Sequence, residues 1–471
     1  MFDLSQQERF FLLSESRNIS FRELSLYSQE LKEIIGERNI IICLSKNNVN
    51  YLCGYISMLC TNNVPILLED NQNNDSLKEY EDTYKPNYYW AHKESQQFEN
   101  LKKVFSIGDF DLFEVSSKKR EIHNDLALLL STSGSTGSKK LVRLSYSNIS
   151  SNASSIAKYL EIKKDDISIS SLPLHYTYGL SIVHSFLLRN AKFFVTNLTF
   201  LQREFWEIMK KNKITHLSGV PYSYEMLKKL KFFDMDLPYL ETLTQAGGKL
   251  SKELHEEFHN FCVKKNKRFF VMYGQTEATS RISYLPFEKK LRKLGSIGIP
   301  IPGGSLKIYD NKNEEIKKHN KTGEIIYEGK NVALGYAESI DSLKLGDYFK
   351  GILNTGDLGY FDIDNFFYIT GRKKRIIKMQ GTRLSLDEIE SNIQNNQDFA
   401  EFTCIGEDDL LIGFTTNLNS EEILKKKLVK DFKIPSKCIK LISVKEIPKT
   451  SSGKKSYEDL KKIYISLSAD R

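Results

Sequence analysis

Residues 128–140 read Leu-Leu-Leu-Ser-Thr-Ser-Gly-Ser-Thr-Gly-Ser-Lys-Lys, an apolar run that changes abruptly into small polar residues closed by lysines. The apolar run predicts a buried strand, and the residues after it predict a turn. Small side chains let backbone N–H groups and hydroxyls converge on phosphate oxygens, while lysine adds positive charge. The stretch therefore predicts a phosphate-binding loop at the end of a strand. Its candidate residues are Thr132, Ser133, Gly134, Ser135, Thr136, Gly137 and Lys140.

The spacing within this loop argues against two other kinds of site. The order Gly134, Gly137, Lys140 does not match the GxxxxGK[ST] pattern of nucleotide-binding P-loops. The pattern GxSxG is absent too, so a hydrolase nucleophile elbow is not predicted. On these residues alone, a flexible turn without a ligand stays open as the alternative.

On either side of the loop, short β-branched or aromatic runs alternate with helical stretches, as at 193–196, 201–211 and 269–273. This alternation predicts an α/β fold with layered sheets and largely parallel strands. From about residue 295, turns rich in Gly, Pro and Asn separate the strands, which predicts a β-rich subdomain. We therefore predict a large N-terminal domain at 1–371, with the β-rich subdomain at about 295–371. We predict that this domain is followed by a hinge at 372–375 and by a small, mobile α+β C-terminal domain at 376–471.

The composition is typical of a globular protein, with 471 residues, 40% apolar and 27% charged. No apolar stretch approaches the roughly 20 residues of a membrane helix, and residues 1–5 do not begin a secretory signal. The six cysteines are scattered without a CxxC pair, which favours free thiols in a reducing compartment. We expect a cytoplasmic protein without a membrane span.

The net charge is +8, and residues 372–471 contribute most of this excess. A basic region suits an anionic partner, such as the phosphates of coenzyme A or an acidic acyl carrier protein. A generally lysine-rich composition explains the charge equally well. No basic helical motif is present, so a nucleic-acid partner is not expected.

The loop at 128–140 resembles the signature loop of the adenylate-forming superfamily, which includes acyl-CoA synthetases, firefly luciferases and peptide-synthetase adenylation domains. The family pattern usually ends with Pro-Lys-Gly, where this chain has Lys139-Lys140-Leu141. Further segments resemble the family's other motifs, in the family's order, over nearly the whole chain. They are residues 19–24, 245–250, 270–277, 323–329 with 335–336, 354–359, 371–372 and 447–454.

This resemblance implies roles for the matching residues. Ala246, Gly247 and Gly248 would lie against the adenine ring of ATP. Tyr273 would stack on that ring, within a motif that also contains Gly274 and Gln275. Thr276 would contact the α-phosphate, and Glu277, with Thr136, would hold Mg2+, a cation that prefers oxygen ligands. Residues 323–329 with Gly335 and Tyr336 are assigned to folding rather than to chemistry.

The resemblance also implies roles for several residues in the C-terminal third of the chain. Asp357 would accept hydrogen bonds from both ribose hydroxyls. Arg372 would lie near the ribose or phosphate, and Lys374 would stand at the hinge. Lys454 would bridge the acid's carboxylate and the α-phosphate, while Lys140 and Mg2+ hold the departing pyrophosphate.

The function implied is ATP-dependent activation of a carboxylic acid to an acyl-adenylate, with release of pyrophosphate and transfer of the acyl group to a thiol. The thiol would belong to coenzyme A or to the phosphopantetheine of a carrier protein. Such an enzyme is an AMP-forming acid–thiol ligase that uses ATP and Mg2+. Two alternatives stay open: a stand-alone amino-acid-activating enzyme that loads a carrier protein, and an inactive nucleotide-binding family member.

Residues 172–180 resemble the family's acid-pocket motif, with His175 and Tyr176 where many acyl and aryl ligases have Phe-His. Peptide-synthetase domains carry an aspartate near this point, and none occurs at 172–185. This favours a fatty, aryl or hydroxy acid over an α-amino acid. A hydrogen-bonded core position for His175 stays open as the alternative.

Residues 255–259 read His-Glu-Glu-Phe-His, which matches the HExxH motif of zinc proteases. Apolar residues at helical spacing around this motif predict a buried helix face. Because no third ligand presents itself, we predict an ordinary amphipathic helix instead of a zinc site.

Overall fold

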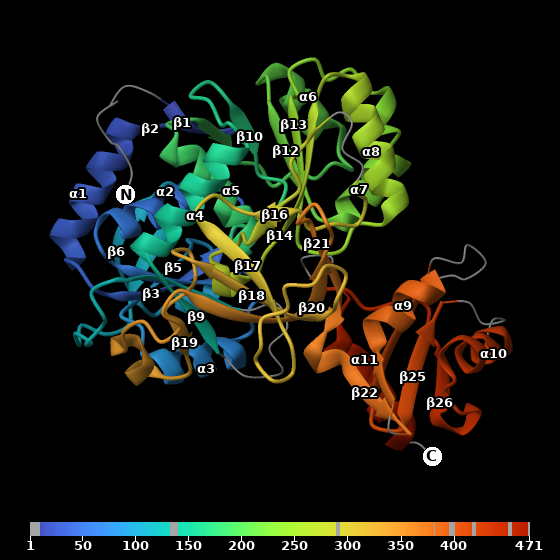
Figure 1. Cartoon of the computed structure of the whole chain (residues 1–471). Coiled ribbons are helices and arrows are strands. Elements are labelled where there is room, and N and C mark those ends of the chain that lie inside the picture. Colours follow the sequence, from blue (N-terminus) through green and yellow to red (C-terminus); the bar gives the residue numbers. More distant parts are fainter. Residues whose placement is uncertain are drawn as a thin grey trace. The chain divides into compact units, whose positions relative to one another are not determined.

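The computed structural model describes residues 10–131, 140–288, 293–380, 382–394, 401–416, 421–450 and 455–469 (Figure 1). Contacts divide the chain into two compact units. The first unit contains 1–305 and 327–353, and the second contains 306–326 and 354–471. The predicted hinge at 372–375 belongs to the second unit, and its role as a hinge stays a prediction. Within the described ranges, no helix has the length and apolar character needed to cross a lipid bilayer.

One layer of the first unit is an eight-stranded sheet in the order β19-β9-β8-β4-β3-β5-β7-β6. Its strands are β3 (Ile40–Ser45), β4 (Val64–Glu69), β5 (Tyr88–His92), β6 (Lys102–Ile107), β7 (Phe110–Glu114), β8 (Leu126–Ser131), β9 (Leu141–Ser145) and β19 (Gly335–Ala337). Strand β3 is parallel to β4 and β5, whereas β8 and β9 are antiparallel, with Ser131 opposite Leu141. The predicted phosphate loop therefore connects two neighbouring strands.

A nine-stranded sheet forms the second layer, in the order β16-β15-β14-β13-β12-β10-β11-β1-β2. Its strands are β1 (Phe10–Leu13), β2 (Ile19–Ser20), β10 (Ile167–Ile169), β11 (Lys192–Phe194), β12 (His216–Gly219), β13 (Thr242–Gln245), β14 (Arg268–Tyr273), β15 (Ser283–Tyr284) and β16 (Ile299–Pro300). The strands from β1 through β14 in this order pair in parallel. The loops that follow β12, β13 and β14 therefore leave the same edge of the sheet, where α/β proteins bind ligands.

Helices cover both sheets of the first unit (Figure 1). They are α1 (Phe21–Ile35), α2 (Val49–Cys60), α3 (Asn74–Tyr84), α4 (Tyr146–Tyr159), α5 (Thr177–Leu188), α6 (Arg203–Lys211), α7 (Pro221–Lys229) and α8 (Lys252–Lys264). Helix α1 begins at a capping box formed by Ser20 and Glu23, within the segment 19–24 that resembles a family motif.

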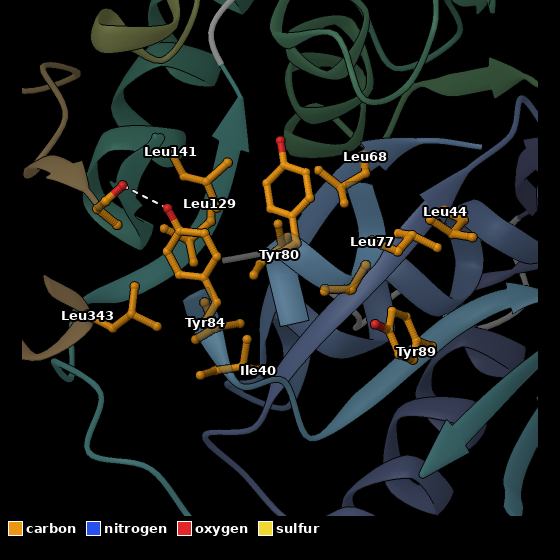
Figure 2. Packing of buried hydrophobic residues seen from close by; sticks show 14 of the residues in the cluster. Ile40, Leu44, Leu68, Leu77, Tyr80, Tyr84, Tyr89, Leu129, Leu141 and Leu343 are labelled. Atoms are coloured by element: carbon orange, nitrogen blue, oxygen red, sulfur yellow. Dashed lines mark hydrogen bonds between the residues drawn. The ribbon is translucent and has the colours of Figure 1, made fainter. Parts of the chain in front are cut away.

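Helix α3 shows how these helices attach to the eight-stranded sheet. Leu77, Tyr80 and Tyr84 from α3 pack with Leu129 and Leu141 from the sheet (Figure 2). The Tyr84 hydroxyl also donates a hydrogen bond of 2.8 Å to the Ala337 carbonyl oxygen. The aliphatic and aromatic side chains bury apolar surface, while the hydroxyl satisfies a backbone acceptor.

Further strands follow from about residue 304. A four-stranded sheet has the order β17-β18-β20-β21, with strands β17 (Gly304–Tyr309), β18 (Gly323–Gly329), β20 (Ile352–Phe361) and β21 (Phe367–Arg372). One strand of the predicted β-rich stretch, β19, pairs instead with β9 in the eight-stranded sheet.

The C-terminal residues form a small α+β fold, as predicted. Its strands are β22 (Ile376–Met379), β23 (Thr382–Ser385), β24 (Phe402–Glu407), β25 (Leu410–Thr415) and β26 (Ile439–Ser443), and its helices are α9 (Leu386–Gln394), α10 (Glu421–Phe432) and α11 (Tyr457–Ala469). Two apolar clusters stabilise it, one containing Ile389 and Leu424 and the other containing Phe414 and Leu460.

Candidate active site

Two of the predicted adenine-binding segments leave the same edge of the nine-stranded sheet. Gln245 at the end of β13 lies opposite Val271 of β14, so residues 246–248 and 273–277 emerge side by side. Gly247 has a φ of +85°, and a Cβ atom there would lie 2.4 Å from the Tyr176 hydroxyl. Only glycine fits this position, which leaves backbone exposed where the motif predicts contact with a flat ring.

A tight turn fixes the residues predicted to contact phosphate and metal. Between Tyr273 and Ile282 the chain reverses, and the Ile282 N–H donates to the Tyr273 carbonyl oxygen at 2.9 Å. A Cβ at Gly274 would lie 1.7 Å from the Ser280 carbonyl oxygen, so the turn requires glycine there. Inside it, a short 3₁₀ helix (Thr276–Ala278) carries the buried Thr276 and the half-buried Glu277.

Glu277 forms a contact that the sequence analysis missed. The Tyr336 hydroxyl donates a hydrogen bond to Glu277 Oε1 at 2.9 Å. Burial, together with Glu277, raises the pKa of Tyr336, so the phenol keeps its proton and remains a donor. Tyr336 lies on β19 opposite Val142 of β9, and this pairing joins segments almost 200 residues apart. Tyr336, which the sequence analysis assigned to folding, thus also contacts the predicted metal ligand.

Lys140 belongs to the same cluster. Its Nζ atom lies 3.7 Å from the centre of the Tyr336 ring and 3.1 Å from Glu338 Oε1. A cation over an aromatic face is attracted by the ring quadrupole, and the carboxylate adds an ion pair. Lys140 immediately precedes β9, so the β9–β19 pairing holds the lysine, Tyr336 and Glu277 together.

The two predicted acid-pocket residues lie at the N-terminus of α5. Burial raises the pKa of Tyr176 to about 12, so its hydroxyl is protonated near neutral pH. Burial lowers the pKa of His175, with Glu69 opposing, and the His175 Nδ1 atom is without a hydrogen-bond partner. Tyr178, two residues further, donates to the Thr244 carbonyl oxygen at 2.9 Å, which fastens the start of the helix to β13.

In the second unit, the predicted ribose residues lie opposite each other on β20 and β21. Arg372 Nε is 3.1 Å from Asp357 Oδ1; the Asp357 side chain is 3% exposed and the Arg372 side chain 63%. Asp387 anchors this strand end by accepting the Arg372 backbone N–H at 2.9 Å. Lys374 is exposed within a short 3₁₀ helix, residues 373–375.

Most of the predicted phosphate loop and the predicted catalytic lysine lie outside the described residues. They are Thr132, Ser133, Gly134, Ser135, Thr136 and Gly137 of the loop, and Lys454. The neighbouring Lys455 is held firmly, because its Nζ atom donates to Glu390 Oε2 and to the Phe402 carbonyl oxygen, both at 3.0 Å.

Glu390 is the centre of a buried polar cluster in the second unit. It accepts hydrogen bonds from the side chains of Arg375, Thr403, Lys455 and Tyr457 and from the Cys404 N–H. Burial alone would raise the pKa of Glu390, but Lys455 and Arg375 hold it below its usual value. The carboxylate therefore stays charged, and it ties the end of the predicted hinge to the residue after Lys454.

The two histidines of the HExxH segment lie on the buried face of α8. Burial lowers the pKa of His255 to about 4, and its ring packs against Phe269 at 5.9 Å. The His259 ring packs against Phe287 at 5.3 Å. Among the residues that the structure describes, no group of three His, Cys, Asp or Glu side chains is arranged to hold a metal.

A family model described as AMP-binding enzyme matches residues 55–337, which include the loops after β12, β13 and β14 and the Glu277–Tyr336–Lys140 cluster. The chain belongs to the AMP-binding enzyme family. The predicted resemblance to the adenylate-forming superfamily is thereby confirmed, and so is the prediction that the chain is an enzyme of the AMP-forming ligase class.

This AMP-binding enzyme has named relatives among the CoA ligases. It is 29% identical over 373 residues to oxalate–CoA ligase of Arabidopsis thaliana, which covers 74% of the chain and 70% of that relative. It is also 29% identical over 352 residues to long-chain-fatty-acid–CoA ligase of Bacillus subtilis, which covers 71% of the chain and 61% of that relative. The match thus spans about two thirds of the relatives' lengths.

Solved structures confirm the predicted fold class. The enzyme is similar to o-succinylbenzoate coenzyme A synthetase from Bacillus subtilis in complex with ATP and magnesium ion, with a TM-score of 0.76 and 22% sequence identity. This similarity covers 96% of each chain. ATP-bound MatB from Rhodopseudomonas palustris gives a TM-score of 0.78 at 20% identity, covering 98% of this chain and 97% of that one.

Proposed function

We propose that this AMP-binding enzyme is an acid–CoA ligase that works in two steps. In the first, a carboxylate oxygen attacks the α-phosphorus of ATP, and the bond to pyrophosphate breaks. In the second, the thiol of coenzyme A attacks the acyl carbon, loses its proton, and AMP leaves with the electrons of the broken C–O bond. The observation that carries this proposal is the cluster of Glu277, Tyr336 and Lys140 beside the loops of the nine-stranded sheet, in a chain whose relatives are named CoA ligases.

The first unit supplies groups suited to the nucleotide. The exposed backbone at Gly247 and the ring of Tyr273 suit an adenine, and Thr276 is fixed by the turn that follows. Lys140 carries the positive charge that a pyrophosphate leaving group requires. The Glu277 carboxylate suits Mg2+, since only its Oε1 is engaged by Tyr336 and this cation binds through one or two carboxylates and several waters. Thr136 is the proposed second protein ligand, and bound Mg2+ would neutralise phosphate charge.

The second unit supplies the ribose carboxylate and the catalytic lysine of the proposal. Asp357 is almost fully buried, so its carboxylate is oriented before a ligand arrives. Two hydroxyl donors facing one carboxylate form a specific pair. Lys454 is the proposed bridge between the acid and the α-phosphate, and the Lys455–Glu390 bond fixes the residue beside it. Lys374 is the proposed hinge residue.

Coenzyme A is the proposed acceptor because the named relatives act on it, and the phosphopantetheine of an acidic carrier protein presents the same thiol. The relatives are named for acids as different as oxalate and long-chain fatty acids, so their names leave the acid open. We also propose a cytoplasmic location, which the free, mostly buried cysteines support.

Acid-dependent exchange of pyrophosphate into ATP tests the proposal. A panel of fatty, aryl, hydroxy, amino and dicarboxylic acids should contain at least one that drives the exchange. Lys454→Ala should lower that rate by roughly 100-fold to 1,000-fold, the usual cost of losing one preorganised charge at a reacting centre. It should spare thioester formation from a supplied acyl-adenylate. The exposed Lys461→Ala is the matched control and should change neither rate.

Normal exchange in Lys454→Ala would remove this lysine from the proposed mechanism. Failure of every acid to drive exchange would contradict the proposed activity. Equal thioester yield from coenzyme A and from a phosphopantetheinyl carrier protein would widen the acceptor to any pantetheine thiol.

A further inference from the structure

Arg281 is a buried cation without an anion. The residue is 2% exposed, and its Nε atom lacks a hydrogen-bond partner. Among the residues that the structure describes, no carboxylate forms an ion pair with its guanidinium. Buried arginines are normally paired, because moving a charge out of water is costly. The missing partner therefore points to a ligand.

Another buried arginine in the same unit, Arg143, shows how a buried guanidinium is usually satisfied within a protein. Arg143 is 1% exposed, and its guanidinium donates to the backbone carbonyl oxygens of Leu334, Tyr336, Leu345 and Gly346. Nearly every N–H group of that side chain has an acceptor within the protein. Arg281 has no equivalent set of carbonyl acceptors around its guanidinium, so the protein does not satisfy its N–H groups in the same way.

Two tyrosines, Tyr178 and Tyr159, lie against Arg281. Its guanidinium carbon lies 4.8 Å from the centre of the Tyr178 ring. Arg281 is also the largest influence opposing the burial that raises the pKa values of Tyr159 and Tyr178, which places both phenols close to the charge. The ring face attracts the cation but accepts none of its N–H groups in a conventional hydrogen bond. Tyr159 is a side-chain hydrogen-bond neighbour of the guanidinium, whereas the Nε–H group still lacks an acceptor.

These tyrosines place the charge beside the acid pocket. The Tyr176 and Tyr178 rings are 6.3 Å apart, and the Tyr176 hydroxyl closes over Gly247 of the proposed adenine site. Gly247, Tyr176, Tyr178 and Arg281 are thus joined by successive contacts. The proposal below places the tail of a bound acid at the Arg281 end of this series.

The backbone of Arg281 is held in place before any ligand binds. Its carbonyl oxygen accepts from the Asn331 side chain at 2.7 Å and from the Asn152 side chain at 3.3 Å. The turn before it is closed by the contact between Gly274 and Ser280, whose φ is +115°. Such fixation lowers the entropic cost of binding a ligand group at the side chain.

We infer that Arg281 binds a second carboxylate of the substrate, so the enzyme's preferred acid is a dicarboxylic acid; this inference rests on the proposed function. A guanidinium presents parallel N–H groups that match a carboxylate in a bidentate pair. The carboxylate at the far end of the acid satisfies the buried charge, while the other carboxylate reacts with ATP. A cation in this place repels the ammonium group of an α-amino acid, which disfavours the amino-acid-activating alternative.

The test compares aliphatic and aromatic dicarboxylic acids with their monomethyl esters in the pyrophosphate-exchange assay. Each ester removes one charge at nearly constant size. The wild-type enzyme should prefer the best diacid over its monoester by roughly 100-fold or more in kcat/KM, as expected when a buried charge loses its partner. Arg281→Met should lower kcat/KM for the diacid by a similar factor and leave the monoester unchanged or improved. Arg281→Lys should give an intermediate loss for the diacid.

A second measurement is independent of catalysis. The diacid alone should raise the thermal unfolding midpoint of the wild-type protein and not that of Arg281→Met, whereas the exposed Arg203→Met control should behave as wild type in both assays. Equal loss for diacid and monoester would show that Arg281 contacts the reacting carboxylate and would overturn the inference. Exchange driven only by monocarboxylic acids would overturn it while leaving the proposed activity intact. No exchange with any acid would remove both.

Discussion

Two arginines with little solvent exposure, one in each unit of the molecule, are held in opposite ways. In the second unit, Arg375 lies 2.5 Å from Asp387 Oδ1 and 2.7 Å from Glu390 Oε1, with the Tyr457 ring 3.9 Å away. In the first unit, Arg281 has aromatic neighbours and no carboxylate among the described residues. Burial alone would lower the pKa of Arg375, but Glu390, Tyr457 and Asp387 together raise it. The comparison separates a charge used to hold a fold together from a charge left open for a ligand.

The largest expected loss of stability follows removal of the Glu390 carboxylate, which Arg375 and Lys455 share in the second unit. Glu390→Ala leaves Lys455 without a carboxylate and Arg375 with only one, and it should lower the free energy of unfolding of that unit by about 3 to 5 kcal/mol. Cys404 is fully buried beside Glu390, so its reaction with a thiol reagent across a urea series reports the opening of this unit. The exposed Glu388→Ala is the matched control. A loss below 1 kcal/mol would show that the cluster does not stabilise the fold.

Replacing each arginine by methionine tests the comparison directly. Arg375→Met should lower the free energy of unfolding by about 3 kcal/mol, because it removes the cation of Asp387 and leaves the buried Glu390 with Lys455 alone. Arg281→Met should lower the free energy of unfolding by less than about 1 kcal/mol, or raise it, since an apolar side chain packs favourably against aromatic rings. Both tryptophans, Trp90 and Trp206, belong to the first unit, so their fluorescence during urea unfolding reports that unit. A large loss for Arg281→Met would mean that the guanidinium has a structural role.

The two units should also respond to acid at different pH values. Burial lowers the pKa values of His184 and His216 from an ordinary 6.5 to about 3, so these side chains are neutral when folded. As the pH falls below 6.5, the unfolded chain binds protons that the folded first unit does not, and stability declines by about 1.4 kcal/mol per pH unit for each histidine. Glu390 has a lowered pKa, so its contribution to the second unit is present above its ordinary value of 4.5 and is lost as the pH falls below it.

Tryptophan fluorescence and Cys404 labelling, followed through a pH series in urea, measure these two responses separately. The first unit should weaken from about pH 6.5 downward and the second mainly below about pH 4.5. His216→Asn should reduce the pH slope of the first unit alone. An unchanged slope in this variant would show that His216 takes up a proton in the folded state.

The smallest loss of stability is expected when one neutral hydrogen-bond donor to Glu390 is removed. The Thr403 hydroxyl donates to Glu390 Oε1 at 2.8 Å, and Thr403→Val removes this bond at nearly constant shape. Three charged or phenolic side chains and the Cys404 N–H still hold the carboxylate, so the loss should be about 1 kcal/mol. Urea unfolding followed by Cys404 labelling measures it. A loss as large as that of Glu390→Ala would mean that the hydroxyl, rather than the cations, governs the cluster.

Sequence patterns predicted the fold class, and the motifs of the candidate site contain glycines whose conformation depends on local chemistry. Gly247 and Gly356 are needed for positive φ values of +85° and +71°, and such requirements are readable from the sequence. The alternation of short strands and helices likewise follows from local patterns of apolar residues.

The contacts of Tyr336 and Arg281 could not be predicted in the same way. Tyr336 reaches Glu277 only because β19 pairs with β9, and a motif match carries no information about that distant pairing. Arg281 follows the predicted Tyr273–Glu277 motif in an ordinary run of alternating residues. Its importance comes from the absence of an anion, which is a property of the folded surroundings. A charged residue between a nucleotide motif and the strand that follows it was the available signal.

The Tyr176 hydroxyl occupies the space that a methyl group at position 247 would need. One phenol therefore contacts the proposed adenine site and, through its neighbour Tyr178, the proposed acid pocket. A smaller side chain at position 176 would open a void beside both, so a change in acid choice made there should also change nucleotide binding.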